Sequence, residues 1–303
     1  MIILILLVFM NLHAGVDTYF KKAENKSSHH AMEGIDYIYM INLDQRPEKY
    51  ERTMDAFRPY NINPYRFSAV NGWSLSFQAL EELGVVYDSS MPEGPIASVY
   101  RHVDGQEYHG FEIMKEPGIA YYCHSLSRGA IGCLLSHLSI LQDAYDSGYQ
   151  TVWVMEDDVR IVSNPHEISS FISVLDNLAP DWDVLFTDHE IKGGTGPVPC
   201  GVIRPRPLVQ LQPLEYYLKR GNINADIEKI GMRFGSASMV VRRSGMKKIL
   251  DFFKTYKIYF PYDIDYFCVP DIHLYALSRD VVTNIAGGES DNARPAYLDK
   301  DKK

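Results

Sequence analysis

The sequence predicts an α/β fold in which helices cover a parallel sheet. Residues 35–43 and residues 65–70 are both β-prone apolar runs. Between them, Pro47 suits the first turn of a helix whose apolar face extends to Phe57. A strand, a helix and a second strand at this spacing indicate a parallel βαβ unit, because two parallel strands require a crossover connection.

The order of helix and strand continues further along the chain. A helical apolar face recurs over residues 127–145, and the strand that follows is expected to begin at Thr151. The other expected elements are short helices or strands, at residues 75–83 (helix), 165–178 (helix), 182–187 (strand), 237–242 (strand) and 243–253 (helix). Residues 87–127 lose the pattern and are expected to form an irregular insertion or a flexible loop region. Residues 192–213 are rich in turn-forming residues and are expected to be a mobile loop.

The expected organisation is a single domain over residues 34–298 that follows an N-terminal segment. Ile2 to Met10 is an unbroken apolar run, which fits a signal peptide over residues 1–14 or an attachment to a membrane. A core strand is the structural alternative for this run. Residues 15–33 are expected to be a linker. If residues 1–14 are a signal, the protein is secretory, periplasmic or membrane-associated; otherwise it is cytoplasmic.

Composition excludes two broad classes of protein. Of the 303 residues, 46% are hydrophobic and 23% are charged, which is ordinary for a globular protein and excludes wholesale disorder. The net charge is −9 and no dense run of Lys or Arg occurs, which argues against generic binding of nucleic acid. The four cysteines show neither a C-x-x-C motif nor zinc spacing, so disulfides and free thiols both remain open.

An acidic triplet is the strongest indication of chemistry. The apolar run from Thr151 to Met155 stops at Glu156, Asp157 and Asp158, which predicts a buried strand that delivers three carboxylates at its carboxyl end. Neighbouring carboxylates repel one another, and a divalent cation such as Mg²⁺ or Mn²⁺ removes that cost and can also hold a diphosphate. The triplet therefore favours a nucleotide-sugar or nucleotide-phosphate enzyme. A solvated acidic turn that is paired with nearby Lys or Arg is the structural alternative.

Four sequence blocks occur in one order and together resemble glycosyltransferase family 25. They are INLDQR, PYRFSAVNG, GAIGCLLSH and EDD, at residues 41–46, 64–72, 129–137 and 156–158. This family includes bacterial lipooligosaccharide galactosyltransferases and procollagen galactosyltransferases. The resemblance implies a GT-A fold, which is a Rossmann-like, mostly parallel sheet flanked by helices. It also implies a nucleotide-sugar donor, usually a UDP-sugar, and inversion at the anomeric carbon. The insertion at residues 87–127 departs from the compact bacterial pattern.

The resemblance and the triplet together give a set of expected donor-site residues. Asp158 is the best single ligand for Mn²⁺ or Mg²⁺, with Glu156 or Asp157 as its companion. The first strand is followed by three residues expected near the nucleotide, namely Asn42, Asp44 and Arg46. Arg46 either pairs with phosphate or closes an ion pair on the helix that follows. The family block at residues 129–137 favours a donor-site role for its last two residues, Ser136 and His137, although a helical histidine is more often structural.

An inverting transfer also needs a carboxylate that takes the proton of the acceptor hydroxyl. The candidates are Asp263, Asp291, Asp265 and Asp188, with Asp263 the first choice; each of them could instead cap a helix or a turn. The expected donor is a UDP-sugar, with UDP-galactose first and UDP-glucose next, and the expected acceptor is a glycan or a hydroxylated protein. The alternatives are a non-catalytic carbohydrate- or nucleotide-sugar-binding protein with a degenerate GT-A domain, and a metal-dependent phosphohydrolase.

Overall fold

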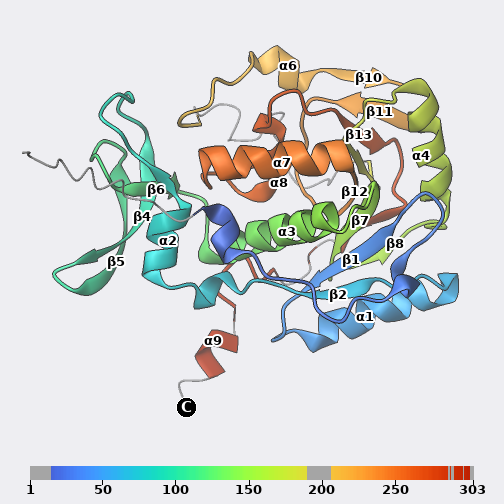
Figure 1. Cartoon of the computed structure of the whole chain (residues 1–303), viewed down its shortest axis with the longest axis horizontal. Coiled ribbons are helices and arrows are strands. Elements are labelled where there is room, and N and C mark those ends of the chain that lie inside the picture. The colour runs from blue at the N-terminus through green and yellow to red at the C-terminus, as the bar shows by residue number, and fades with distance from the viewer. Residues whose placement is uncertain (1–14, 190–205, 286, 288–289, 296, 301–303) are drawn as a thin grey trace, which may run out of the picture.

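A computed structural model describes residues 15–189, 206–285, 287, 290–295 and 297–300 of the chain (Figure 1). Its central sheet contains the strands β1 (Tyr37–Asn42), β2 (Tyr65–Ser68), β7 (Thr151–Glu156), β9 (Val184–Phe186), β10 (Arg220–Asn222), β11 (Ile227–Ile230), β12 (Ser238–Arg242) and β13 (Leu274–Leu277). They lie in the order β10-β11-β13-β9-β12-β7-β1-β2. β1 is parallel to both β2 and β7, and β13 is parallel to β9, whereas β12 and β11 are antiparallel to both of their neighbours. Only β11 and β12 therefore run against the common direction, which confirms the mostly parallel sheet.

Helices cover both faces of this sheet. The helices are α1 (Pro47–Phe57), α2 (Phe77–Leu83), α3 (Arg128–Asp146), α4 (Glu167–Leu178), α6 (Leu214–Leu218), α7 (Arg243–Tyr256), α8 (Tyr262–Asp265) and α9 (Tyr297–Lys300), with short 3-10 turns η1 (Val16–Tyr19), η2 (Ser28–His30), η3 (Arg58–Tyr60), η4 (Gly72–Ser74) and η5 (Tyr266–Cys268). Side chains alternate along β1, so that Tyr39 packs into the core under α3 and α7 while Met40 packs into the core that α4 covers. Figure 1 shows α3 and α7 side by side on one face. The predicted βαβ unit and the helix preceding β7 are confirmed.

The expectation of an irregular region at residues 87–127 is wrong. This region forms most of a second, antiparallel sheet, ordered β3-β6-β4-β5, from β3 (Val85–Val86), β4 (Ile96–Val103), β5 (Gln106–Ile113) and β6 (Ala120–Cys123). A tight hairpin joins β4 to β5 through Asp104 and Gly105, whose φ angles of 51° and 78° are those that an Asp-Gly turn requires. This dipeptide is the signal that the scattered Gly and Pro residues obscured. A further small pair joins β8 (Val159–Ile161) to β14 (Val282–Asn284).

Residues 15–33 do not form the free linker that the sequence predicts, because they pack along the domain. The side chain of Val16 is fully buried, and the hydroxyl of Tyr19 donates to Glu82 of α2. Lys26 Nζ lies 2.6 Å from Asp143 Oδ2 on α3. Residues 1–14 lie outside the described residues, as do residues 192–205 of the expected loop. No helix among the described residues is both long and apolar enough to cross a membrane.

The described cysteines are free thiols. Cys123 and Cys268 are buried, and Cys133 is half-buried. Cys200 lies outside the described residues. The closest pair in sequence, Cys123 and Cys133, is therefore not joined by a disulfide.

Candidate active site

The acidic triplet lies where β7 ends, beside the carboxyl end of β1. Asn42, the last residue of β1, donates from Nδ2 to Asp157 Oδ2 at 2.6 Å. The backbone carbonyl of Asp157 accepts a hydrogen bond of 2.6 Å from Thr53 Oγ1 on α1. Among the described residues, Asp158 Oδ1 is buried and has no hydrogen-bond partner. The turn after β7 is thus anchored through Asp157, and it leaves an oxygen of Asp158 available.

Burial perturbs all three carboxylates. Burial raises the pKa of Asp157 to about 6, although the hydrogen bond from Asn42 and the charge of Lys49 oppose it. Burial, followed by repulsion from Glu156 and Asp157, raises the pKa of Asp158 to about 7. Burial alone would also raise the pKa of Glu156, but hydrogen bonds from His137 and Ser236 and the charge of His137 lower it. A hard divalent cation fits this set of donors, because it offsets repulsion that the protein's own groups leave uncompensated at Asp158.

Two adjoining cavities meet at the triplet. The first cavity, of about 80 Å³, is lined by residues from β1, α1, η4, α3 and the C-terminal segment, among them Lys49, Asn71, Trp73, Gly129, Ser136, Asp157 and Asp291. The second cavity, of about 260 Å³, is lined by residues that include Gly235, Ser236, Tyr262, Asp263 and Asn284. Both cavities are lined by Cys133, Glu156, Asp158, Ser290 and Asn292. Asp158 therefore stands at the junction of two spaces, an arrangement that suits a reaction between two substrates.

Helix α3 contributes the floor of the site. His137 is fully buried, with Nε2 3.2 Å from Glu156 Oε1 and its ring stacked on Tyr262 at a centroid distance of 4.4 Å. Ser136 Oγ accepts from the backbone N–H of Val70 at 2.8 Å, which ties the helix to the loop after β2. His137 thus orients Glu156, a carboxylate of the triplet. Ser136 lines the first cavity and also fixes Val70, another residue of its wall, by the hydrogen bond to the Val70 backbone.

Two glycines allow this helix to approach the loop. A Cβ atom on Gly72 would lie 1.8 Å from the carbonyl oxygen of Arg128, and one on Gly132 would lie 2.4 Å from the backbone nitrogen of Gly72. Both distances are far below a van der Waals contact, so the close approach of α3 to η4 depends on the absence of side chains at these two positions.

The polar residues after β1 separate into two groups. Asp44 is more than half exposed and accepts hydrogen bonds from Arg66 Nη2 at 2.7 Å and Ser68 Oγ at 2.8 Å. Arg46 Nε lies 2.6 Å from Glu48 Oε1 on α1, and its Nη1 pairs with Asp291. Asp44 thus braces β2, whereas Arg46 belongs to a charged cluster at the rim of the first cavity.

Lys49, Trp73 and Asn284 line the two cavities, and sequence reasoning did not single them out. Lys49 lies on the buried face of α1, and its Nζ is 2.6 Å from Asp291 Oδ2. The signal available in the sequence was a lysine one turn before Thr53, on a face that the helix must bury. Trp73 and Asn284 carry no comparable local signal.

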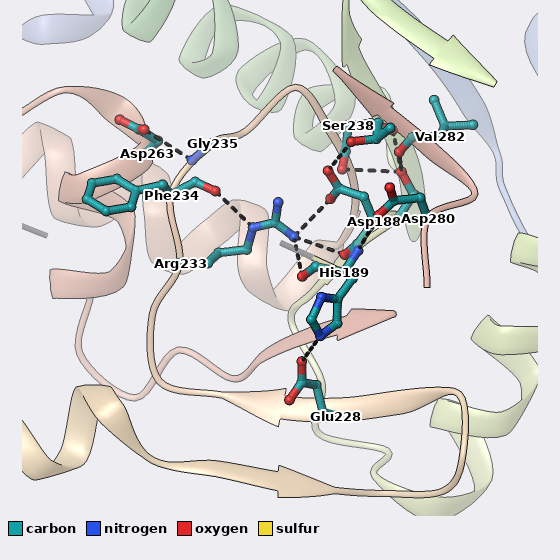
Figure 2. A network of polar contacts seen from close by, with 12 residues as sticks. Asp188, His189, Glu228, Arg233, Phe234, Gly235, Ser238, Asp263, Asp280 and Val282 are labelled. Carbon is teal, nitrogen blue, oxygen red and sulfur yellow. Dashed lines mark hydrogen bonds and ion pairs between the residues drawn. The ribbon is translucent and has the colours of Figure 1, made fainter. Parts of the chain in front are cut away.

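The four carboxylates considered as a base occupy different environments. Asp263 lines the second cavity, where the backbone N–H of Gly235 donates to its Oδ2 at 3.1 Å, and burial raises its pKa (Figure 2). Asp291 lines the first cavity and pairs with Arg46 and Lys49. Asp265 is fully buried and pairs with the buried Arg206.

Asp188 is the fourth of these carboxylates, and it lies within a network of polar contacts (Figure 2). Its Oδ1 is 2.9 Å from Arg233 Nη1, and its Oδ2 accepts a hydrogen bond of 2.8 Å from Thr283. The structure thus brings Asp263 and Asp291 to the cavities beside the triplet, whereas Asp265 and Asp188 form buried ion pairs with arginines.

Comparison with known proteins identifies the family of this chain. The sequence model of the family described as glycosyltransferase family 25 (LPS biosynthesis protein) matches residues 35–267. Similar curated proteins include inactive glycosyltransferase 25 family member 3 of Homo sapiens (29% identity over 160 residues, 50% of this chain and 22% of the relative). They also include a glycosyltransferase 25 family member of Drosophila melanogaster (28% over 170 residues, 55% and 23%) and procollagen galactosyltransferase 1 of Danio rerio (27% over 154 residues, 50% and 21%).

These matches span between a fifth and a quarter of the length of the curated relatives. The family match is much broader on this chain, because it runs from before β1 to η5 and includes all four sequence blocks, of which the acidic triplet is one. It covers well over half of the 303 residues. This protein therefore belongs to glycosyltransferase family 25.

Proposed function

We propose that this protein is an inverting, metal-dependent glycosyltransferase. It moves a hexose from a UDP-sugar to a hydroxyl of a glycan or a hydroxylated protein, with galactose the first choice and glucose the next. The observation that carries this proposal is the position of Asp158, which offers a buried oxygen and lines both cavities. Family membership supports a nucleotide-sugar donor, and the similarity to procollagen galactosyltransferase 1 of Danio rerio supports galactose.

Asp158, with Glu156 or Asp157, would hold Mn²⁺ or Mg²⁺, which supplies positive charge to the departing diphosphate. The donor would occupy the first cavity, on the side of β1 and α1. Lys49 adds a fixed positive charge to the wall of that cavity, where it faces the phosphates. His137 holds Glu156 through a contact of 3.2 Å and is a positioning residue.

The acceptor would enter the second cavity, in which Asp263 is the proposed general base. Asp263 and Asp158 line the same space, so an acceptor hydroxyl placed between them faces the base on one side and the metal-bound donor on the other. Burial raises the pKa of Asp263, which suits a group that must take up a proton. We propose that Asp265 and Asp188 are structural, because an arginine partner neutralises each inside the core.

The decisive measurement is the release of UDP from UDP-galactose and UDP-glucose, with Mn²⁺ and with EDTA. A transferase of the proposed kind releases UDP only with metal, and faster once a suitable acceptor is added. The human relative is named as inactive, and a non-catalytic binding protein of that kind would bind UDP in calorimetry without turnover. A phosphohydrolase would cleave the diphosphate instead. Full activity in EDTA, or tighter binding of GDP or CMP than of UDP, would contradict the proposal.

A further inference from the structure

The C-terminal segment at residues 290–295, called here the C-terminal strap, forms part of the wall of the first cavity through Ser290, Asp291 and Asn292. We propose that it is a displaceable latch, in which the carboxylate of Asp291 occupies the site that Arg46 and Lys49 provide for the diphosphate of the donor. Binding of the nucleotide then releases the strap. This inference rests on the proposed function, since the natural occupant of the site is a nucleoside diphosphate.

The first support is the way in which Asp291 is held. One of its oxygens pairs with Arg46 Nη1, and the other lies 2.6 Å from Lys49 Nζ. All three side chains are largely buried: Asp291 is 13% exposed, Arg46 is 12% exposed and Lys49 is 6% exposed. A carboxylate between two cations has the charge and the two-oxygen geometry that a phosphate group would present to them. The strap thus places an anion of its own beside Lys49, a cation in the wall of the first cavity, and beside the neighbouring Arg46.

The second support is the set of contacts that hold the strap closed. The indole N–H of Trp73 donates to the carbonyl oxygen of Asp291 at 3.3 Å, and the hydroxyl of Ser127 donates to the carbonyl oxygen of Asn292. Gly129 allows the close approach, because a Cβ atom there would lie 2.5 Å from the carbonyl oxygen of Asp291. Ser290 and residues 292–294 of the strap are exposed, whereas Pro295 is buried. The contacts therefore specify one closed position and leave most of the strap outside the core.

The third support is size. The first cavity measures about 80 Å³ with the strap in place. Sites for small ligands and cofactors have volumes of roughly 300–1,000 Å³. Because Ser290, Asp291 and Asn292 form one wall, movement of the strap is the change that enlarges the cavity without disturbing the sheet.

This arrangement also bears on whether Asp291 is the base. Both of its oxygens already receive a cation, and its cavity is the one that we assign to the donor. A base must instead face the acceptor. Neutralising Asp291 therefore has opposite consequences in the two cases: it removes a competitor if Asp291 is a latch, and it removes the proton acceptor if Asp291 is the base.

The test compares wild-type protein with Asp291→Asn and Gly129→Ala, all as full chains. Gly129→Ala pushes the strap away but keeps Asp291, Arg46 and Lys49, so it tests the latch by a second route. Asp251→Asn is the matched control, because Asp251 pairs with Lys247 on the exposed face of α7 and lies outside both cavities. UDP binding is measured by calorimetry in Mn²⁺, and the strap is followed by the hydrogen exchange of its backbone amides.

Inorganic pyrophosphate with Mn²⁺ serves as a second probe, because it presents a diphosphate without a nucleoside. Either ligand is expected to speed exchange in the strap of the wild-type protein. Asp291→Asn and Gly129→Ala are expected to show fast exchange without ligand. Asp291→Asn is also expected to bind UDP about tenfold more tightly, if the closed strap is populated about nine-tenths of the time. Asp251→Asn should match wild type in every respect.

The latch is overturned if the strap exchanges equally with and without saturating UDP, or if Asp291→Asn binds UDP no more tightly than wild type. Either result leaves the proposed function standing, provided that UDP-sugar is still turned over. Failure of the proposed function looks different: neither wild type nor Asp291→Asn would bind UDP or release it from UDP-sugars. Loss of turnover in Asp291→Asn with unchanged UDP binding would assign Asp291 as the base and would also overturn the latch.

Discussion

The backbone N–H of Gly235 donates to Asp263 Oδ2 at 3.1 Å and holds the carboxylate at the wall of the second cavity. The loop that carries Gly235 is itself held two residues earlier, where Arg233 pairs with Asp188 at 2.9 Å and donates to the carbonyl oxygen of Phe234 at 3.1 Å (Figure 2). The proposed base is thus positioned by the backbone, and a buried ion pair fixes that backbone.

Asp263→Asn is expected to reduce turnover by about 10²–10⁴-fold, the usual effect of removing a general base. Because Asp263 lies away from the first cavity, UDP binding in Mn²⁺ should stay within a few-fold of wild type. Release of UDP in the presence of acceptor and calorimetry with UDP measure the two effects. Near-normal turnover of Asp263→Asn would show that the base is a different residue.

Asp158→Asn is expected to abolish activation by Mn²⁺ and to change how stability depends on pH. Burial raises the pKa of Asp158 to about 7, whereas an unfolded aspartate titrates near pH 4 (about 3.9). Below about pH 4 this carboxyl is protonated in both the folded and the unfolded state, so it does not destabilise the metal-free protein. Above about pH 7 it is ionised in both states, and burial of its charge destabilises the fold to the full extent.

The melting temperature of the wild-type protein in EDTA should accordingly fall as the pH rises through this window. The fall should be smaller in Asp158→Asn, while Asp157, whose pKa is raised to about 6, accounts for part of the remainder. Circular dichroism at each pH provides the measurement. If the melting temperatures of the two proteins depended on pH in the same way, the destabilisation could not be assigned to Asp158.

Asp265→Ala is expected to destabilise the fold by about 3–5 kcal/mol, because it leaves the guanidinium of Arg206 buried without its partner. The double variant Arg206→Met and Asp265→Leu removes both charges and should recover much of this loss. Urea denaturation of the two variants gives the comparison. A stable Asp265→Ala protein that has lost turnover would instead point to a catalytic role for Asp265.

Removal of residues 1–14 is expected to leave the melting temperature nearly unchanged, in keeping with a targeting or anchoring segment outside the fold. Val16→Ala, by contrast, should cost ~2 kcal/mol, because this side chain is fully buried against the domain. Thermal unfolding of both variants shows whether residues 1–14 and the segment that carries Val16 differ in their contribution to stability. A large loss of stability on deleting residues 1–14 would show that they belong to the core.

The parts of the fold that were predicted from sequence are those set by local periodicity. The β-prone apolar run of β1, the helical face of α3 and the apolar run before Glu156 each act over a few neighbouring residues, and they place the triplet at a strand end. The contact of Arg46 with Asp291 joins residues 245 positions apart, and no local pattern reports it. The β4–β5 hairpin could have been predicted from the sequence, because Asp104 and Gly105 form a two-residue turn signal.

The close approach of Gly72 and Gly132 has a consequence for the history of this sequence. Each glycine belongs to a different sequence block, and each leaves room for backbone that the other block provides. A side chain gained at either position would need a compensating shift of a whole helix, so substitutions in the two blocks are not independent events. In a search for distant relatives, the two glycines should therefore be treated as a single feature and not as two independent matches. Chains that keep only one of them should differ in how the helix packs against the loop.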